Sequence, residues 1–133
     1  AAAWAHRAIA DIDELAIGDT PLERLTALLE RIVYVAAAEP TLTSAIIQAV
    51  TSDDSSVDDP RTVLFLFLRD RLSTAIGDPV PERDDVEIVL GHVLLAALVS
   101  LASLRQPADE VAAMVRTAGK LVLEGALAVA TAS

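Results

Sequence analysis

The segment from Val86 to Leu104 constrains the fold of this chain more than any other. Its 19 residues contain only two titratable groups, Glu87 and His92. A helix of this composition is apolar on almost every side, so a single neighbouring surface cannot cover it. The segment must therefore be buried in a core, wrapped by a second subunit or placed in a membrane.

A membrane span meets the length rule of about 17–25 residues, but the sequence around the segment argues against one. His92, Ser100 and Ser103 interrupt the apolar run, and an acidic cluster at 82–87 overlaps its start. No polybasic flank fixes an orientation, and charged residues interrupt the next apolar segment. We therefore expect a cytoplasmic chain that does not enter the membrane.

Length and composition limit the class of protein further. A chain of 133 residues predicts a single all-helical domain over residues 1–133. Its net charge of −10 argues against binding to DNA, because binding to the phosphate backbone depends on clustered Lys and Arg. Cysteine is absent, which excludes disulfides and thiolate metal sites. No cofactor is expected.

Apolar residues recur at helical spacing throughout, and strand alternation is missing. Thr20-Pro21-Leu22-Glu23 supplies an N-cap, a proline at the first helical position and a glutamate placed for a capping box. Glu39-Pro40 ends that helix, Thr41 is expected to cap a short one, and Gly77 is expected to end a longer one. The sequence thus predicts an all-α, six-helix bundle. Its helices are expected at about 2–16, 21–39, 41–49, 60–76, 84–104 and 109–128.

The last two helices predict a symmetric homodimer. Small residues such as Gly91 and Gly119 let helices approach closely, and two helices per subunit can pair with their copies as a dimeric four-helix bundle. The alternative is an ordinary core helix within a monomer. The expected interface residues are Ala97, Ser100, Leu101, Val115, Ala118 and Val122.

Catalytic and metal-binding patterns are missing, so we expect no enzyme and no metal site. His6 and His92 are far apart in the sequence, and no His-Glu-x-x-His motif or Gly-rich phosphate loop is present. His92 has two interpretations: a core histidine paired with a neighbouring acceptor, or the polar anchor of an apolar ligand pocket.

A ligand pocket follows if two apolar helix faces oppose each other. Phe65, Leu68 and Leu72 share one face, and His92 and Leu95 share another. With only 3% aromatic residues, side chains are less able to fill the space between these faces. The expected ligand is a hydrophobic molecule with one polar end, such as a fatty acyl or polycyclic compound.

Three stretches carry a family resemblance: Thr20-Pro21-Leu22-Glu23-Arg24-Leu25, Glu39-Pro40-Thr41-Leu42-Thr43-Ser44-Ala45 and Asp109-Glu110-Val111. With the order of the helices, they resemble the C-terminal domain of TetR-family transcriptional regulators over nearly all of residues 1–128. Within that family the chain looks most similar to actinobacterial repressors of lipid and sterol breakdown.

The resemblance implies a domain that dimerises and binds a small hydrophobic effector. Operator DNA is then expected to be contacted only through an N-terminal helix-turn-helix domain, which we expect to be missing from this sequence. The resemblance places the ligand among the middle helices, and the candidate residues are Trp4, Tyr34, Phe65, Leu68, Leu72, His92 and Leu95. The alternatives are a helical oligomerisation module without a ligand and a small membrane-associated protein.

Overall fold

A computed structural model describes residues 18–51, 58–77 and 83–132. These residues form five α-helices and no strand, so the all-α prediction is confirmed for the described part of the chain. The helix expected at 2–16 lies outside the described residues. The helices are α2 (Pro21–Ala38), α3 (Pro40–Thr51), α4 (Asp58–Ile76), α5 (Arg83–Ala102) and α6 (Ala108–Ala132).

The ends of the helices follow local signals, with two departures from expectation. Thr20 is the N-cap of α2, and its side-chain oxygen accepts the Glu23 backbone N–H at 3.1 Å. The Glu23 carboxylate accepts the N–H of Asp19 at 2.9 Å, one residue before the N–H that a capping box uses. Thr41 was wrongly expected to cap the next helix, because α3 already begins at Pro40.

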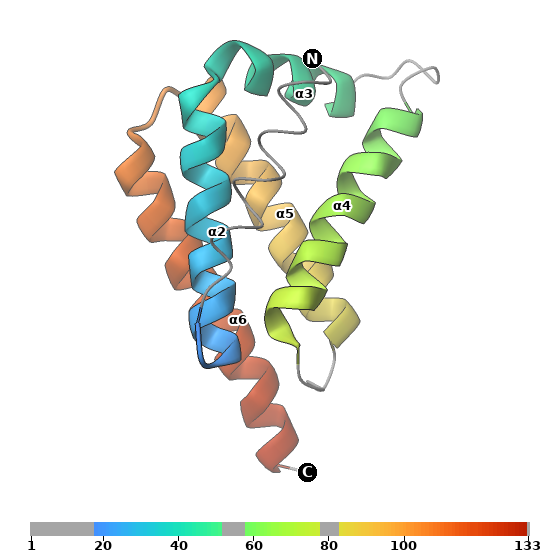
Figure 1. Ribbon diagram of the computed structural model, residues 1–133, viewed down its shortest axis with the longest axis vertical. Coiled ribbons are helices and arrows are strands. Elements are labelled where there is room, and N and C mark those ends of the chain that lie inside the picture. Colours follow the sequence, from blue (N-terminus) through green and yellow to red (C-terminus); the bar gives the residue numbers. More distant parts are fainter. Residues whose placement is uncertain (1–17, 52–57, 78–82, 133) are drawn as a thin grey trace.

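The corner between α2 and α3 is sharp, with the two helix axes 105° apart. Thr43 holds this corner closed. Its buried hydroxyl lies 2.8 Å from the Ala36 carbonyl oxygen and 3.0 Å from that of Glu39. α3 therefore turns away from α2 and lies across one end of the bundle, while α6 projects beyond the opposite end (Figure 1).

Helix α2 packs against each of the other four described helices, as α5 also does. The buried side of α2 is a stripe of leucine, isoleucine and valine at helical spacing. The main core gathers buried side chains from α2, α4, α5 and α6, among them Leu25, Leu28, Leu29, Ile32, Val33, Leu68, Leu72, Leu90, Leu94, Ala97, Val111, Val115 and Leu123.

A close approach between α2 and α6 depends on Gly119. A Cβ atom at this position would lie 2.6 Å from Cδ1 of Leu29, well inside van der Waals contact. The expected role of small residues is therefore seen at Gly119, although the partner is α2 rather than the other long helix. A Cβ at Gly91 would meet nothing within 4 Å.

Arg24 links the start of α2 to the end of α4. Its guanidinium donates to the carbonyl oxygens of Ala75 at 2.7 Å and Ile76 at 3.2 Å, which the end of α4 leaves without helical partners. Gly77 follows with a positive φ of 69°, which confirms the expected glycine at the end of this helix.

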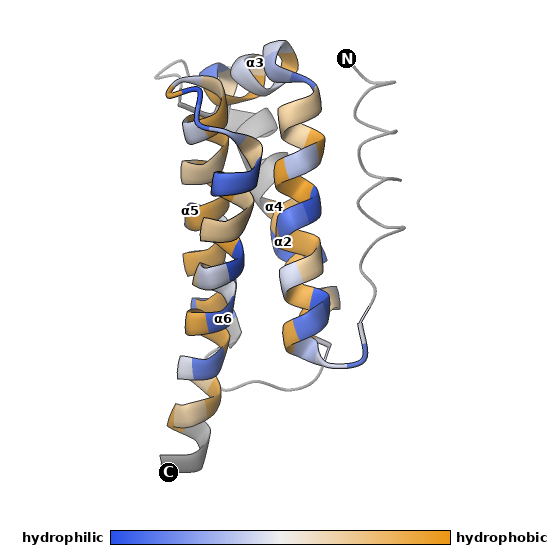
Figure 2. Ribbon diagram, turned by 90° about the vertical axis from the view of Figure 1, so that its left-hand side faces the viewer, coloured by the Kyte–Doolittle hydropathy of each residue, from blue (hydrophilic) through white to orange (hydrophobic). Residues whose placement is uncertain are grey.

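The apolar segment that dominates the sequence is α5, and the bundle covers only one of its sides. Val86, Leu90 and Leu94 are buried in the main core, whereas Ile88 and Val89 are 50% and 45% exposed. Among the described residues, Asp84–Ala102 is long and apolar enough to cross a membrane, a test that core helices of soluble proteins also pass. In Figure 2, α5 and α6 carry hydrophobic residues along most of their length.

Candidate functional site

The expected ligand-binding residues that the structure describes do not lie together. Leu68 and Leu72 of α4 are buried in the main core together with Leu90 and Leu94 of α5. His92 lies on the exposed side of α5, where its Nδ1 is 2.8 Å from the Ile88 carbonyl oxygen. The structure therefore does not bring His92 together with Leu68 and Leu72, because α5 presents its other side to the core.

The remaining expected ligand residues do not complete a pocket either. Leu95 is half-buried. Tyr34 is exposed on α2, and its hydroxyl donates to Oδ1 of Asp109 at 2.7 Å. This hydrogen bond to a carboxylate stabilises the neutral phenol and raises the pKa of Tyr34. Trp4 and the side chain of Phe65 lie outside the described residues. The role of these residues in ligand binding stays a prediction.

A pocket of about 310 Å³ instead lies where α2, α3, α5 and α6 meet. We call it the corner pocket; its lining residues are Ala36, Ala37, Pro40, Thr43, Leu101, Ala102, Arg105, Gln106 and Ala108. A second small cluster of buried side chains, Ala36, Ile47 and Leu98, lies beside it. Of the expected site residues that the structure describes, only Leu101 lines this pocket, and it was expected at the dimer interface.

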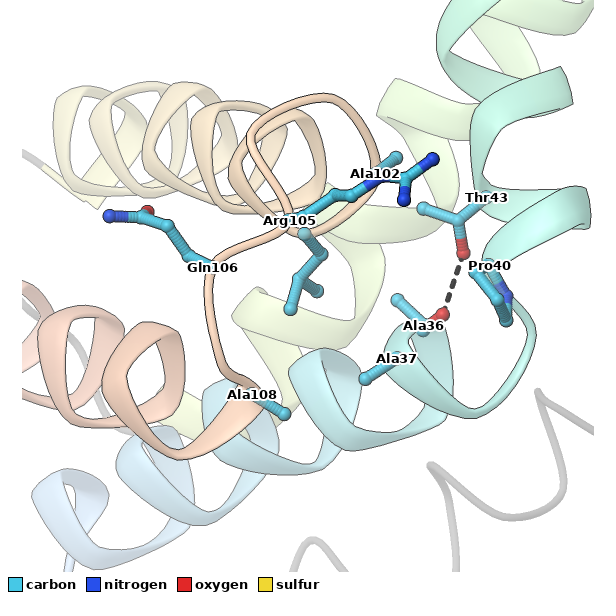
Figure 3. Close-up of a pocket in the computed structure, with 9 residues that line it drawn as sticks. Ala36, Ala37, Pro40, Thr43, Ala102, Arg105, Gln106 and Ala108 are labelled. Carbon is cyan, nitrogen blue, oxygen red and sulfur yellow. Dashed lines mark hydrogen bonds between the residues drawn. The ribbon is translucent and has the colours of Figure 1, made fainter.

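Among the described residues that line the corner pocket, Arg105 is the only charged one. Its backbone has a φ of 53°, a left-handed conformation that is usually adopted by glycine at the ends of helices. The Gln106 N–H donates to the Ser100 carbonyl oxygen at 3.0 Å and closes the turn after α5. Figure 3 shows the Arg105 side chain extending past Ala102 towards Thr43.

A shallower, polar hollow of about 400 Å³ lies between α4 and α5. Here Arg69 donates to the buried carboxylate of Glu87 at 2.9 Å and to Asp84 at 2.8 Å. The hydrogen bonds to these two carboxylates raise the pKa of the Arg69 guanidinium. The hollow is lined by an ion-pair network that joins two helices. Within the described residues, no group of three or more His, Cys, Asp or Glu is placed to hold a metal ion.

The expected dimer-interface residues are buried or half-buried within the chain itself. Ala97 and Val115 have no exposed surface. Leu101 and Val122 are half-buried against the main core. Ser100 and Ala118 are also half-buried, and the Ser100 hydroxyl donates to the Ala96 carbonyl oxygen at 3.0 Å. Their part in a dimer stays a prediction.

The exposed side chains of α5 and α6 are different residues. We define the outer face as five exposed apolar residues and one histidine: Ile88, Val89, His92, Ala96, Met114 and Leu121. Leu127 and Val129, near the end of α6, are exposed as well and are not included. On α5, Val89, His92 and Ala96 follow one another at helical spacing, and on α6 Met114 and Leu121 are two turns apart. The sequence contains this spacing, but it does not say which side of each apolar helix the bundle covers.

Comparison with known proteins assigns the family. Residues 18–122 match the family described as the tetracyclin repressor-like, C-terminal domain. No curated relative and no solved structure matches the chain. The chain therefore belongs to the tetracyclin repressor-like (TetR) family and contains its C-terminal regulatory domain, as the resemblance predicted. Domains of this class typically dimerise and bind small-molecule effectors.

Proposed function

We propose that this domain dimerises through its outer face and binds a small hydrophobic effector, and that the effector controls transcriptional repression in the cytoplasm. In this proposal, operator DNA is contacted by a helix-turn-helix domain, and the acidic domain makes no contact with it. Family membership supports regulation as the role, since TetR-family domains are not typically enzymes.

One observation carries the dimer: the side of α5 that the bundle leaves uncovered is apolar. Ile88 and Val89 are about half exposed, and Leu121 on the neighbouring α6 is 64% exposed. Neighbouring exposed side chains of this kind mark an interaction surface. A two-fold axis beside α5 and α6 would cover them with the same residues of a second copy.

Leu121→Arg tests this interface. The change places a charge in the proposed interface but leaves the chain's own core intact, because Leu121 does not contribute to that core. Light scattering is expected to give twice 14.0 kDa for the unmodified chain and a lower mass for the variant. Ala97→Arg is a poorer test, because it places a charge in the chain's own core and is expected to unfold it.

Leu66→Arg is the matched control, since Leu66 is 62% exposed on α4, outside the outer face. A dimer that survives Leu121→Arg at micromolar concentration, or that Leu66→Arg disrupts equally, contradicts the proposed interface. A chain that is monomeric without any change excludes it.

Effector binding is tested by thermal shift with fatty acyl and polycyclic compounds. A ligand that binds only the folded state raises stability by about 2.7 kcal/mol at a hundredfold excess over its Kd. His92→Leu, compared with unmodified protein, shows whether His92 contributes, as the sequence predicts. If no apolar ligand changes the melting temperature, the domain is an oligomerisation module without an effector.

A further inference from the structure

The corner pocket exists because small side chains meet where four helices converge. Four of its lining residues are alanines, and these are contributed by α2, by the end of α5 and by the start of α6. Protein interiors are normally packed to crystal-like density. A volume of about 310 Å³ lies at the lower end of the range of ligand pockets, about 300–1,000 Å³. The pocket is therefore large enough for a small ligand.

The polar groups of the pocket are not equivalent. Thr43 already uses its hydroxyl to close the corner between α2 and α3. In Figure 3 the Gln106 side chain points away from Arg105 and the alanines. No hydrogen bond or ion pair joins the Arg105 guanidinium to another residue in the described part of the chain. Arg105 is thus the group with free capacity to recognise a ligand.

The charges around the pocket favour an anionic head group at Arg105. None of the described residues that line the pocket is acidic. The nearest acid in sequence on α6 is Asp109, whose carboxylate accepts the Tyr34 hydroxyl, and Glu39 is exposed at the end of α2. A guanidinium presents paired N–H donors that match the two oxygens of a carboxylate. The left-handed backbone of Arg105 directs this group across the pocket at a conformational cost that glycine would avoid.

We propose that the corner pocket binds an amphiphilic monocarboxylate, with its apolar tail against the alanine wall and its carboxylate on Arg105. The inference rests on the proposed function, because it identifies the chemical class and the site of the effector. It differs from the sequence-based expectation in the anchor, which is Arg105 rather than His92, and in the location, which is the end of the bundle rather than its middle helices.

Sodium octanoate is the probe, and titration calorimetry on the full chain gives its Kd. Octanol and octylammonium carry the same tail with a neutral and a cationic head. We expect octanoate to bind most tightly and octylammonium least. Shortening the octanoate tail to hexanoate is expected to weaken binding roughly fourfold for each buried methylene lost.

Variants separate the head group from the tail. Arg105→Gln is expected to weaken the binding of octanoate at least tenfold, which corresponds to about 1.4 kcal/mol. The Kd of octanol is expected to stay unchanged. Lys120→Gln removes the same charge from an exposed position on α6 and is expected to leave the Kd of octanoate unchanged. Ala37→Leu fills the pocket and is expected to weaken the binding of both octanoate and octanol. Ala38→Leu changes an exposed position outside the lining and is expected to leave both affinities unchanged.

If Arg105→Gln folds poorly, Arg105→Gly replaces it, because glycine adopts the left-handed backbone without strain. Equal octanoate affinity in the unmodified chain and the Arg105 variants overturns the proposal, as does octylammonium binding as tightly as octanoate. An apolar effector that binds independently of Arg105, in a dimeric chain, contradicts this site but leaves the proposed function intact. A monomer that binds octanoate through Arg105 supports this site and contradicts the proposed dimer.

Discussion

Gly119→Ala measures how closely α6 approaches α2. In an exposed helix the change is stabilising by about 1 kcal/mol, because glycine loses more backbone entropy than alanine on folding. Here the new Cβ would lie 2.6 Å from Cδ1 of Leu29, a side chain with no exposed surface. Overpacking of this kind costs about 1–3 kcal/mol. The net effect is expected to lie between neutral and about 2 kcal/mol destabilising.

Gly91→Ala is the matched control within another helix. Nothing lies within 4 Å of its new Cβ, so the change is expected to stabilise by the full propensity gain of about 1 kcal/mol. The difference between the two variants, about 1–3 kcal/mol, isolates the close approach from helix propensity. With a urea m-value of about 2 kcal/mol/M, the two unfolding midpoints should differ by about 0.5–1.5 M.

The assay is urea unfolding followed by far-ultraviolet circular dichroism. All variants are compared at one protein concentration, because a dimer makes the midpoint concentration-dependent. Truncating Leu29 to alanine should remove the penalty, so the cycle of Gly119→Ala with Leu29→Ala is expected to show positive coupling. If Gly119→Ala stabilises as much as Gly91→Ala, the packing of α6 on α2 described above is wrong.

Three further changes test other parts of the structure. Arg24→Met is expected to cost about 2 kcal/mol in urea unfolding, because the last carbonyls of α4 lose a charged donor; Arg116→Met, which removes an exposed ion pair, should cost less than about 1 kcal/mol. Tyr34 is the only tyrosine, so absorbance at alkaline pH reports its pKa directly. We expect the pKa of Tyr34 to lie above the ordinary value of about 10, and we expect Asp109→Asn to lower it. The stability that this hydrogen bond contributes is present below pH 10 and is lost as the pH rises through the raised pKa. A Tyr34 pKa unchanged by Asp109→Asn would contradict the hydrogen bond. Arg105→Gly should raise stability by about 1 kcal/mol in the absence of ligand, since it relieves a left-handed backbone, and a loss would show that the side chain stabilises the turn.

The candidate site was only partly accessible from the sequence. The apolar character of α5 and α6 and the expectation of a dimer follow from composition and spacing. The corner pocket does not, because its lining combines short stretches of the chain that are up to about 70 positions apart. Arg105 carries no sequence signal for its role either, since the left-handed conformation that positions it is usually associated with glycine.

The sequence alone determined the features that depend on neighbouring residues. The start of α2 at Thr20-Pro21 and the end of α4 at Gly77 involve groups within a few positions of one another, so the local pattern specifies them. The side of α5 that is covered and the point where α6 approaches α2 depend instead on contacts between distant parts of the chain. An apolar helix gives no internal indication of its buried side, because burying any of its faces lowers the free energy of the folded chain. The contact between Gly119 and Leu29 joins positions 90 residues apart, and the packing of the whole bundle selects it.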